Sequence, residues 1–236
     1  MRKWDCLPES MKSAEVKLYY DMLQKKRISL LMKRFFDIFV SSVLLILFSP
    51  LFFVIAVAIK LDSPGPVFYR QVRVTRYAEN FRIFKFRTMV TGADKGSLLT
   101  VAQDSRVTRV GRILRKYKID ELSQLIDVFR GTMSFVGTRP EVPKYVEKYT
   151  PEMMATLLLP AGITSEASVY YKDENELLDN SDNPEDVYVN RILPDKMHYN
   201  LNAIKNFSFF NEIVIMIKTV LAVFIGRNSE EAKTPV

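Results

Sequence analysis

Residues Ile38–Ile59 read IFVSSVLLILFSPLFFVIAVAI and carry no charged side chain over 22 positions. At about 1.5 Å per residue, a helix of this length matches a hydrocarbon core about 30 Å thick. Buried helices of water-soluble domains are seldom so long and so uniformly apolar. The stretch therefore predicts a membrane segment, and the sequence on either side bears on its path.

Ser49 and Pro50 lie at the middle of this stretch. Proline has no backbone N–H, and its ring crowds the carbonyl four residues back, here that of Ile46, so a helix kinks or breaks at this point. The Ser49 hydroxyl could donate a hydrogen bond to a carbonyl that the break sets free. Two paths fit: a kinked helix that spans the bilayer, and a helix–break–helix hairpin that enters and leaves on one face.

Basic residues flank both ends of the apolar stretch, and basic residues mark the cytoplasmic side of a membrane. They are Lys25, Lys26, Arg27, Lys33 and Arg34 before the stretch, and Lys60, Arg70, Arg73 and Arg76 after it. The residues alone leave the re-entrant and the spanning path open. A cleaved signal peptide is not expected, because its apolar region is only about 7–15 residues long and lies close to the N-terminus.

Composition suits one compact domain beside the membrane segment, since the chain has 236 residues of which 48% are hydrophobic. The net charge is +7, and residues 63–118 hold 13 Lys and Arg against 3 Asp and Glu. A block of this kind favours polyanions: phosphate esters, nucleic acid or an anionic lipid surface. Cys6 is the only cysteine, so an internal disulfide is excluded, which fits a reducing compartment.

Hydrophobic periodicity predicts further elements around the membrane segment. An amphipathic helix is expected within Glu9–Leu31, a strand or hairpin at Phe81–Arg87, and two consecutive helices within Asp104–Arg130. Asn206–Gly226 suits a helix that lies against the membrane or the domain. Arg227–Val236 is polar and predicts a disordered tail.

The candidate chemistry lies at Arg115, Asp120 and Glu121, next to the basic block. His198 is the only histidine, so a zinc-type Cys/His cluster and a His-dependent triad are not expected. A carboxylate can attack phosphorus once arginines and a magnesium ion neutralise the anionic substrate. The alternative is structural, because paired acids that open a helix also suit the positive end of its dipole.

At this point the chain resembles a known family, the bacterial sugar transferases, or monotopic phosphoglycosyl transferases, of surface-glycan assembly. The motifs that carry the resemblance are KRFFD (Lys33–Asp37), the Ser49-Pro50 break, PGPVFYRQVR (Pro64–Arg73), FKFRTM (Phe84–Met89), DSRVTRVGRILRKYKIDELSQLIDVFRG (Asp104–Gly131) and MSFVGTRP (Met133–Pro140). They are long and keep their order from Lys33 to about Gly226, so the match is specific.

The resemblance implies a mainly α fold with short β elements. Residues 33–60 would form a re-entrant membrane helix broken at Ser49 and Pro50. Residues 61–226 would form a small cytoplasm-facing catalytic domain with membrane-associated helices. Residues 1–32 are then an N-terminal extension and residues 227–236 a disordered tail. The implied location is the bacterial inner (cytoplasmic) membrane.

The implied reaction moves a sugar-1-phosphate from a nucleoside diphosphate sugar, usually a UDP-sugar, to polyprenyl phosphate and releases UMP. By motif match, Asp120 would be the nucleophile that forms a phosphosugar–aspartate intermediate, and Glu121 would bind Mg²⁺. The expected phosphate and substrate contacts are Arg115, Arg139, Lys85 and Arg87. Downstream glycosyltransferases and an oligomer are further expected partners, and nucleic acid is not.

Several positions depart from the family pattern. Thr132 stands where Asp is usual, Thr138 where Pro is usual, and Ser123 replaces the usual proline after DEL. Two rival hypotheses remain, and only the second of them rests on Thr132 and Thr138. One is a single-span membrane protein whose basic face binds nucleic acid or anionic lipid, and the other is a catalytically inactive scaffold of the same fold.

Overall fold

The computed structural model describes residues 1–93, 106–171, 178 and 183–231, with side chains up to residue 222. The fold is mainly helical with short strands, as predicted. The helices are α1 (Ala14–Gln24), α2 (Arg27–Leu47), α3 (Ser49–Asp62), α4 (Arg109–Lys116), α5 (Leu125–Arg130), α6 (Pro143–Val146), α7 (Glu166–Tyr170), α9 (Pro184–Val187), α10 (Leu193–Lys205) and α11 (Phe209–Glu231). Shorter helical turns include η3 (Arg76–Ala78), η5 (Ile119–Gln124), η6 (Met153–Leu158) and η7 (Tyr188–Ile192).

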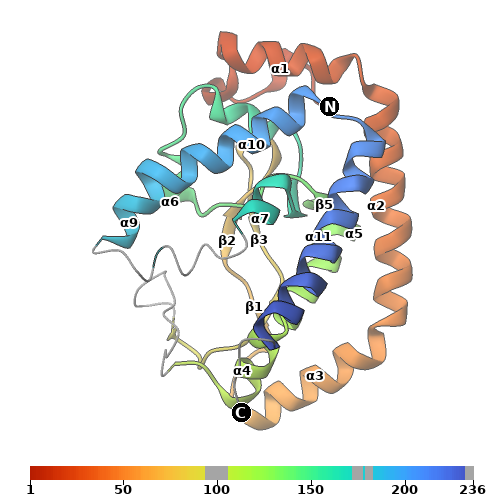
Figure 1. Ribbon diagram of the computed structural model, residues 1–236, viewed down its shortest axis with the longest axis vertical. Coiled ribbons are helices and arrows are strands. Elements are labelled where there is room, and N and C mark those ends of the chain that lie inside the picture. Colours follow the sequence, from red (N-terminus) through yellow and green to blue (C-terminus); the bar gives the residue numbers. More distant parts are fainter. Residues whose placement is uncertain (94–105, 172–177, 179–182, 232–236) are drawn as a thin grey trace.

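The strands form three small two-stranded sheets. They are β1 (Phe68–Tyr69) with β4 (Lys85–Phe86), β2 (Val72–Val74) with β3 (Asn80–Arg82), and β5 (Met133–Val136) with β6 (Ala161–Thr164). The first two pairs are antiparallel and the third is parallel. Figure 1 shows α1 along the top, α2 down one side and α3 along the bottom, with the other elements inside this frame.

The predicted break separates α2 from α3. The two helices are bent by 61° at Phe48, so that Pro50 falls in the first turn of α3, where its missing N–H costs nothing. The Ser49 hydroxyl donates to the Ile46 carbonyl at 2.8 Å, which is the carbonyl that the proline leaves unpaired. Within the described residues, no straight helix meets the length and hydropathy expected of a membrane span; this bent pair does so together.

The outward faces of α2 and α3 expose large apolar side chains to the surroundings. The most exposed are Ile28, Leu31, Phe35, Phe39, Ile46 and Leu47 on α2, and Phe53, Val54 and Leu61 on α3. A water-soluble protein rarely presents so large a continuous apolar patch. This surface is therefore suited to lipid or to a protein partner.

The KRFFD motif fastens α2 to the rest of the chain. Lys33 Nζ donates to the Val136 carbonyl at 2.7 Å and pairs with Glu212 of α11. Arg34 donates to the carbonyls of Val128 and Phe129, so it satisfies the C-terminal end of α5. The next turn contributes Asp37, which accepts from the Ser134 hydroxyl and the Phe135 N–H in β5.

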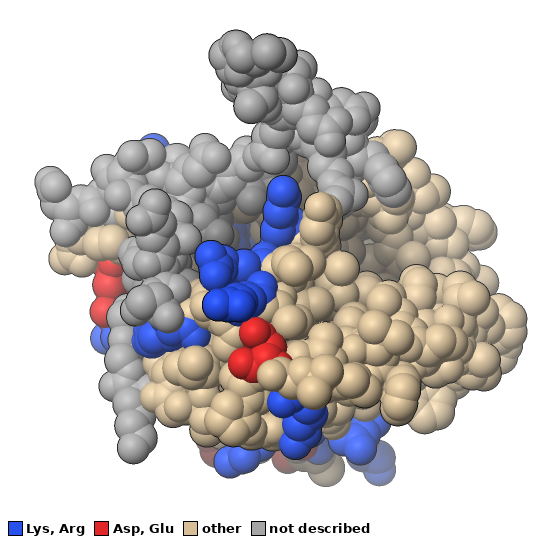
Figure 2. All heavy atoms as spheres, turned by 90° about the horizontal axis from the view of Figure 1, so that it is seen from below, with Lys and Arg blue, Asp and Glu red and all other residues tan. Residues whose placement is uncertain are grey.

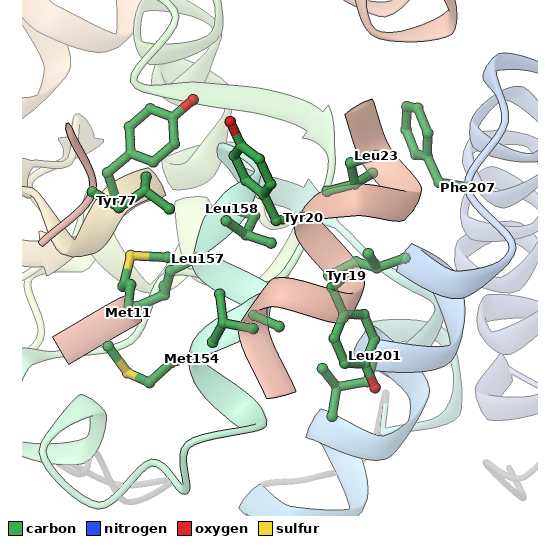
Figure 3. Close-up of a cluster of buried hydrophobic side chains, with 14 of the residues drawn as sticks. Met11, Tyr19, Tyr20, Leu23, Tyr77, Met154, Leu157, Leu158, Leu201 and Phe207 are labelled. Carbon is green, nitrogen blue, oxygen red and sulfur yellow. The ribbon is translucent and has the colours of Figure 1, made fainter. Parts of the chain in front are cut away.

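The N-terminal segment is part of the main hydrophobic core. Its buried side chains pack against η6, η3 and the end of α10; they are Leu7, Met11, Val16, Tyr19, Tyr20 and Leu23. Figure 3 shows Met11, Tyr19, Tyr20 and Leu23 in this cluster. Tyr77 and Ala78 of η3 have positive φ values of 59° and 56°, an unfavourable conformation for residues other than glycine. The Tyr77 hydroxyl accepts from the backbone N–H of Arg2, so the segment braces this turn.

Helix α11 continues beyond the apolar segment expected to end at Gly226 and remains helical to Glu231. Its first turns lie beside α2 and β5, and Figure 1 shows it running diagonally inside the frame. The predicted disordered tail therefore overlaps the helix over residues 227–231, and residues 232–236 lie outside the described part of the chain.

Candidate active site

Asp120 and Glu121 open the short helix η5. Lys118, with a φ of 55°, turns the chain sharply between α4 and η5. The Ser123 hydroxyl then donates to the Phe84 carbonyl at 3.1 Å, which ties η5 to the strand that carries Lys85. The paired acids occupy the first turn of a helix, which fits the alternative that they only stabilise the positive end of its dipole. However, side chains from other elements also surround them.

Two cations from distant parts of the sequence converge on Glu121. Lys85 Nζ and Arg139 Nη2 each lie 2.8 Å from Glu121 Oε1. Burial favours a higher pKa for Glu121, but the two cations outweigh it and hold the pKa well below its usual range. Glu121 is thus kept ionised, and it draws β4 and the chain after β5 together.

Asp120 differs electrostatically from its neighbour. Burial raises the pKa of Asp120, the charge of Glu121 adds to the rise, and Lys85 and Arg115 oppose it. The net result is a pKa above the ordinary aspartate value. Adjacent carboxylates with opposite shifts are typical of sites that give two acids separate tasks.

Arg115 and Arg139 are each positioned by a residue that sequence reasoning did not propose for the site. Arg115 Nε donates to the Thr88 hydroxyl at 2.8 Å. Arg73 Nη1 donates to the Pro140 carbonyl at 3.0 Å, directly after Arg139 in the chain. Arg73 and Thr88 lie inside two of the quoted motifs, PGPVFYRQVR and FKFRTM, which was the available signal.

Arg87 has a different place from the one predicted. Its side chain is only 5% exposed, and its guanidinium donates to the carbonyls of Ser63 and Pro64 at 2.6 and 2.8 Å. These bonds hold the turn that follows α3. The structure therefore assigns Arg87 to this turn and not to the group around Glu121.

Thr132, where the family pattern has Asp, caps α5. Its hydroxyl donates to the Asp127 carbonyl at 3.1 Å, and its own carbonyl accepts from the Thr75 hydroxyl at 2.6 Å. Asp127 is buried and accepts from the Phe84 N–H at 2.8 Å. The Thr132 hydroxyl and carbonyl thus bond Asp127 and Thr75, and neither of these bonds involves Asp120 or Glu121.

Magnesium fits the two adjacent carboxylates only if the substrate supplies further oxygens. Among the described residues there is no group of three or more His, Cys, Asp and Glu side chains that could hold a metal ion. Protein magnesium sites often consist of one or two carboxylates completed by substrate phosphates and water. Asp120 and Glu121 match that donor set.

The site is partly open and lies near the end of the molecule formed by α3 and α4. Glu121 is 21% exposed and Arg139 42% exposed. Figure 2 views this end from below and shows Lys and Arg gathered around a few acidic groups, next to a broad uncharged surface. Two small cavities lie elsewhere, near Val136, and neither is lined by Asp120 or Glu121.

Comparison with known proteins decides the family. The model of the family described as "Bacterial sugar transferase" matches residues 28–226. The chain belongs to the bacterial sugar transferase family. The paired acids Asp120 and Glu121 fall inside the matched part, and so do the three residues around them, Lys85, Arg115 and Arg139.

Three relatives of this family are similar to most of the chain. UDP-N-acetylgalactosamine-undecaprenyl-phosphate N-acetylgalactosaminephosphotransferase of Aeromonas hydrophila is 36% identical over 82% of this chain and 44% of its own length. Exopolysaccharide production protein ExoY of Rhizobium meliloti is 33% identical over 84% and 87%. UDP-glucose:undecaprenyl-phosphate glucose-1-phosphate transferase of Klebsiella pneumoniae is 34% identical over 86% and 42%. The chain thus spans less than half the length of the first and third.

Proposed function

We propose that this chain is a phosphoglycosyl transferase that moves a sugar-1-phosphate from a UDP-sugar to polyprenyl phosphate, as the first membrane step of surface-glycan assembly. The observation that carries the proposal is the pair Asp120 and Glu121 among Lys85, Arg115 and Arg139. Two of the relatives above are named for undecaprenyl-phosphate and a UDP-sugar, which supports the same pair of substrates here.

The proposed reaction has two displacements at one phosphorus. Asp120 attacks the sugar-bearing phosphorus of the UDP-sugar, the bond from this phosphorus to the bridging oxygen breaks, and UMP leaves with that oxygen. A phosphate oxygen of the lipid then attacks the same phosphorus, the bond to Asp120 breaks, and the carboxylate is regenerated. The lipid product is a polyprenyl diphosphate sugar.

Each neighbouring cation has a task in this scheme. Arg115 and Arg139 neutralise the diphosphate and hold it for in-line attack, because guanidinium groups contact phosphate oxygens in pairs. Lys85 opposes the rise that burial causes in the pKa of Asp120, and so favours its ionised form. Mg²⁺, held by Glu121 with the substrate phosphates, supplies further charge neutralisation when it is bound.

Replacement of the nucleophile tests this proposal. Purified protein is incubated with a panel of UDP-sugars, polyprenyl phosphate and Mg²⁺, and UMP is measured. Asp120→Asn is expected to lose activity by on the order of 10⁴-fold or more. Asp21→Asn on the exposed face of α1 is the matched control and should keep full activity. An Asp120→Asn protein with full activity would refute the nucleophile and favour another site.

We also propose that α2 and α3 form a re-entrant hairpin with both ends on the cytoplasmic side. The 61° bend and the exposed apolar faces of both helices support it. In a Cys6→Ser background, Lys25→Cys and Lys60→Cys place thiols at exposed, charged positions near the two ends of the pair, outside its apolar faces. An impermeant maleimide should label neither thiol in intact cells and both after permeabilisation. Labelling of one thiol from outside would show a spanning path.

A further inference from the structure

Helix α4 carries three basic side chains that the proposed reaction does not use. Gly111 and Leu114 face inward, while Arg109, Arg112 and Lys116 are exposed. Arg115 lies on another side of the helix, where it contacts Thr88 and the candidate active site. The helix thus divides its basic residues between the site and an outer face.

Apolar side chains lie among these basic residues. Ile113 is 58% exposed, and Tyr117, which directly follows the last residue of α4, is 47% exposed. A helix face that mixes Lys and Arg with aliphatic and aromatic groups is typical of a membrane interface. A face that binds only nucleic acid backbone has no need of an exposed isoleucine.

Helix α4 is also fixed to the proposed membrane helix. Asp62, the last residue of α3, accepts from the Val110 N–H at 2.9 Å and so caps the first turn of α4. Leu114 packs in one cluster with Ile55 and Ile59 of α3. The outer face of α4 therefore begins close to the end of α3.

We propose that Arg109, Arg112 and Lys116, with Ile113 and Tyr117, form a docking surface for the headgroups of anionic phospholipids in the bilayer. The inference rests on the membrane placement proposed above. Near a membrane surface, each Lys or Arg strengthens attraction to anionic lipid about fivefold. Three of them on one face would recruit anionic lipid beside the active site and hold the site at headgroup level.

The test places a reporter on this face in the full chain. In a Cys6→Ser background, Ile113→Cys carries a fluorophore, and the protein is reconstituted in nanodiscs of phosphatidylcholine and phosphatidylglycerol. A spin label sits on the headgroup of one lipid or the other. Phosphatidylglycerol should quench more strongly than phosphatidylcholine, and added salt should reduce the difference.

Charge variants show whether this face causes the preference. Arg109→Gln with Arg112→Gln and Lys116→Gln should abolish it, whereas Arg→Lys at the first two positions should keep it. The matched control removes the same charge from exposed positions on other elements, with Lys25→Gln, Lys148→Gln and Arg191→Gln, and should leave the preference unchanged.

The outcomes separate this inference from the proposals on which it rests. Equal quenching by both lipids, or a preference that survives loss of the three charges, overturns the docking surface alone. A preference cancelled by stoichiometric oligonucleotide overturns it in favour of nucleic acid. Absence of quenching by either lipid overturns the membrane placement as well. Asp120→Asn should quench like the parent, because lipid contact needs no catalysis.

Discussion

Asp120 and Glu121 are neighbours in sequence whose surroundings make them chemically different. Lys85 and Arg139 hold the pKa of Glu121 well below its usual range against the effect of burial. Burial raises the pKa of Asp120, and the nearby cations Lys85 and Arg115 offset only part of this rise. Glu121 therefore stays charged through the working pH range, and the protonation of Asp120 decides when a nucleophile is present.

The pH dependence of UMP release should report Asp120. The carboxylate attacks only when it is ionised, so activity is lost as pH falls through the raised pKa of this group. Arg115 lowers that pKa, so Arg115→Gln should move the acid limb of the pH–rate profile to higher pH. Arg115→Lys keeps the positive charge, so the acid limb should lie close to its pH in the parent protein. An acid limb that stays in place in Arg115→Gln would contradict this electrostatic role.

Glu121 should control the demand for magnesium. Glu121→Gln removes the charge that both the cation pair and the metal ion need, so UMP release should require a higher Mg²⁺ concentration than in the parent. A titration of activity against Mg²⁺ measures this directly. If the half-saturating Mg²⁺ concentration is unchanged, Glu121 does not bind the metal ion and only pairs with Lys85 and Arg139.

The residues of the site were only partly predictable. Asp120, Glu121, Arg115, Arg139 and Lys85 were named from motifs, and the structure brings them together. Spacing alone could not have paired Lys85 with Glu121, since 36 residues separate them. In a long strand, Arg87 would lie on the same face as Lys85. However, β4 ends at Phe86, and the Arg87 guanidinium bonds the carbonyls of Ser63 and Pro64 instead.

At the scale of elements, the fit of α4 against the strand region depends on a missing side chain. A Cβ on Gly111 would lie 2.0 Å from the Thr88 carbonyl oxygen. Gly111→Ala should push α4 away, weaken the bond between Arg115 and Thr88, and lower UMP release together with the melting temperature. Overpacking of this kind costs about 1–3 kcal/mol. A variant with unaltered melting temperature and activity would show that α4 is not held there.

The attachment of α11 to α2 depends on the ion pair between Lys33 and Glu212. Their side chains are 7% and 13% exposed, so loss of either partner leaves a poorly solvated charge. Lys33→Met and Glu212→Met should each reduce the free energy of unfolding by about 3–5 kcal/mol, and the double variant by less than their sum. Strictly additive losses, measured by unfolding in detergent, would mean that the two residues act independently.

The bend between α2 and α3 was predictable because its cause is local. Proline removes one donor, and the structure shows both the bend and the Ser49 hydroxyl on the Ile46 carbonyl. Docking of α2 by Lys33, Arg34 and Asp37 was not predictable, since their partners lie about a hundred residues away. The break could therefore be predicted from the local sequence, whereas the contacts of α2 could be identified only from the tertiary structure.

At the scale of the whole molecule, the N-terminal segment is more than an extension. It lies before the part matched by the family model, which starts at residue 28, yet it fills the main core. Its amphipathic pattern was evident in the sequence. The surface that it covers could not be identified, because that surface comes from η3, η6 and α10.

A pair of neighbouring residues tests this contribution to the core. Leu23 is fully buried and Met22 is 40% exposed on the same helix. Leu23→Ala should reduce the free energy of unfolding by about 2–5 kcal/mol, because it leaves a cavity in the core. Met22→Ala should change it by less than about 0.5 kcal/mol. Equal and small effects would mean that α1 is only loosely attached.

The account as a whole depends on a covalent step at Asp120. The most direct measurement is mass spectrometry of the protein, quenched after incubation with a UDP-sugar and Mg²⁺ but without lipid acceptor. We predict an added mass equal to one sugar phosphate less one water, on the peptide that contains Asp120. The adduct should be absent from Asp120→Asn and removed by polyprenyl phosphate. Release of UMP without any adduct, or an adduct that persists in Asp120→Asn, would contradict the account.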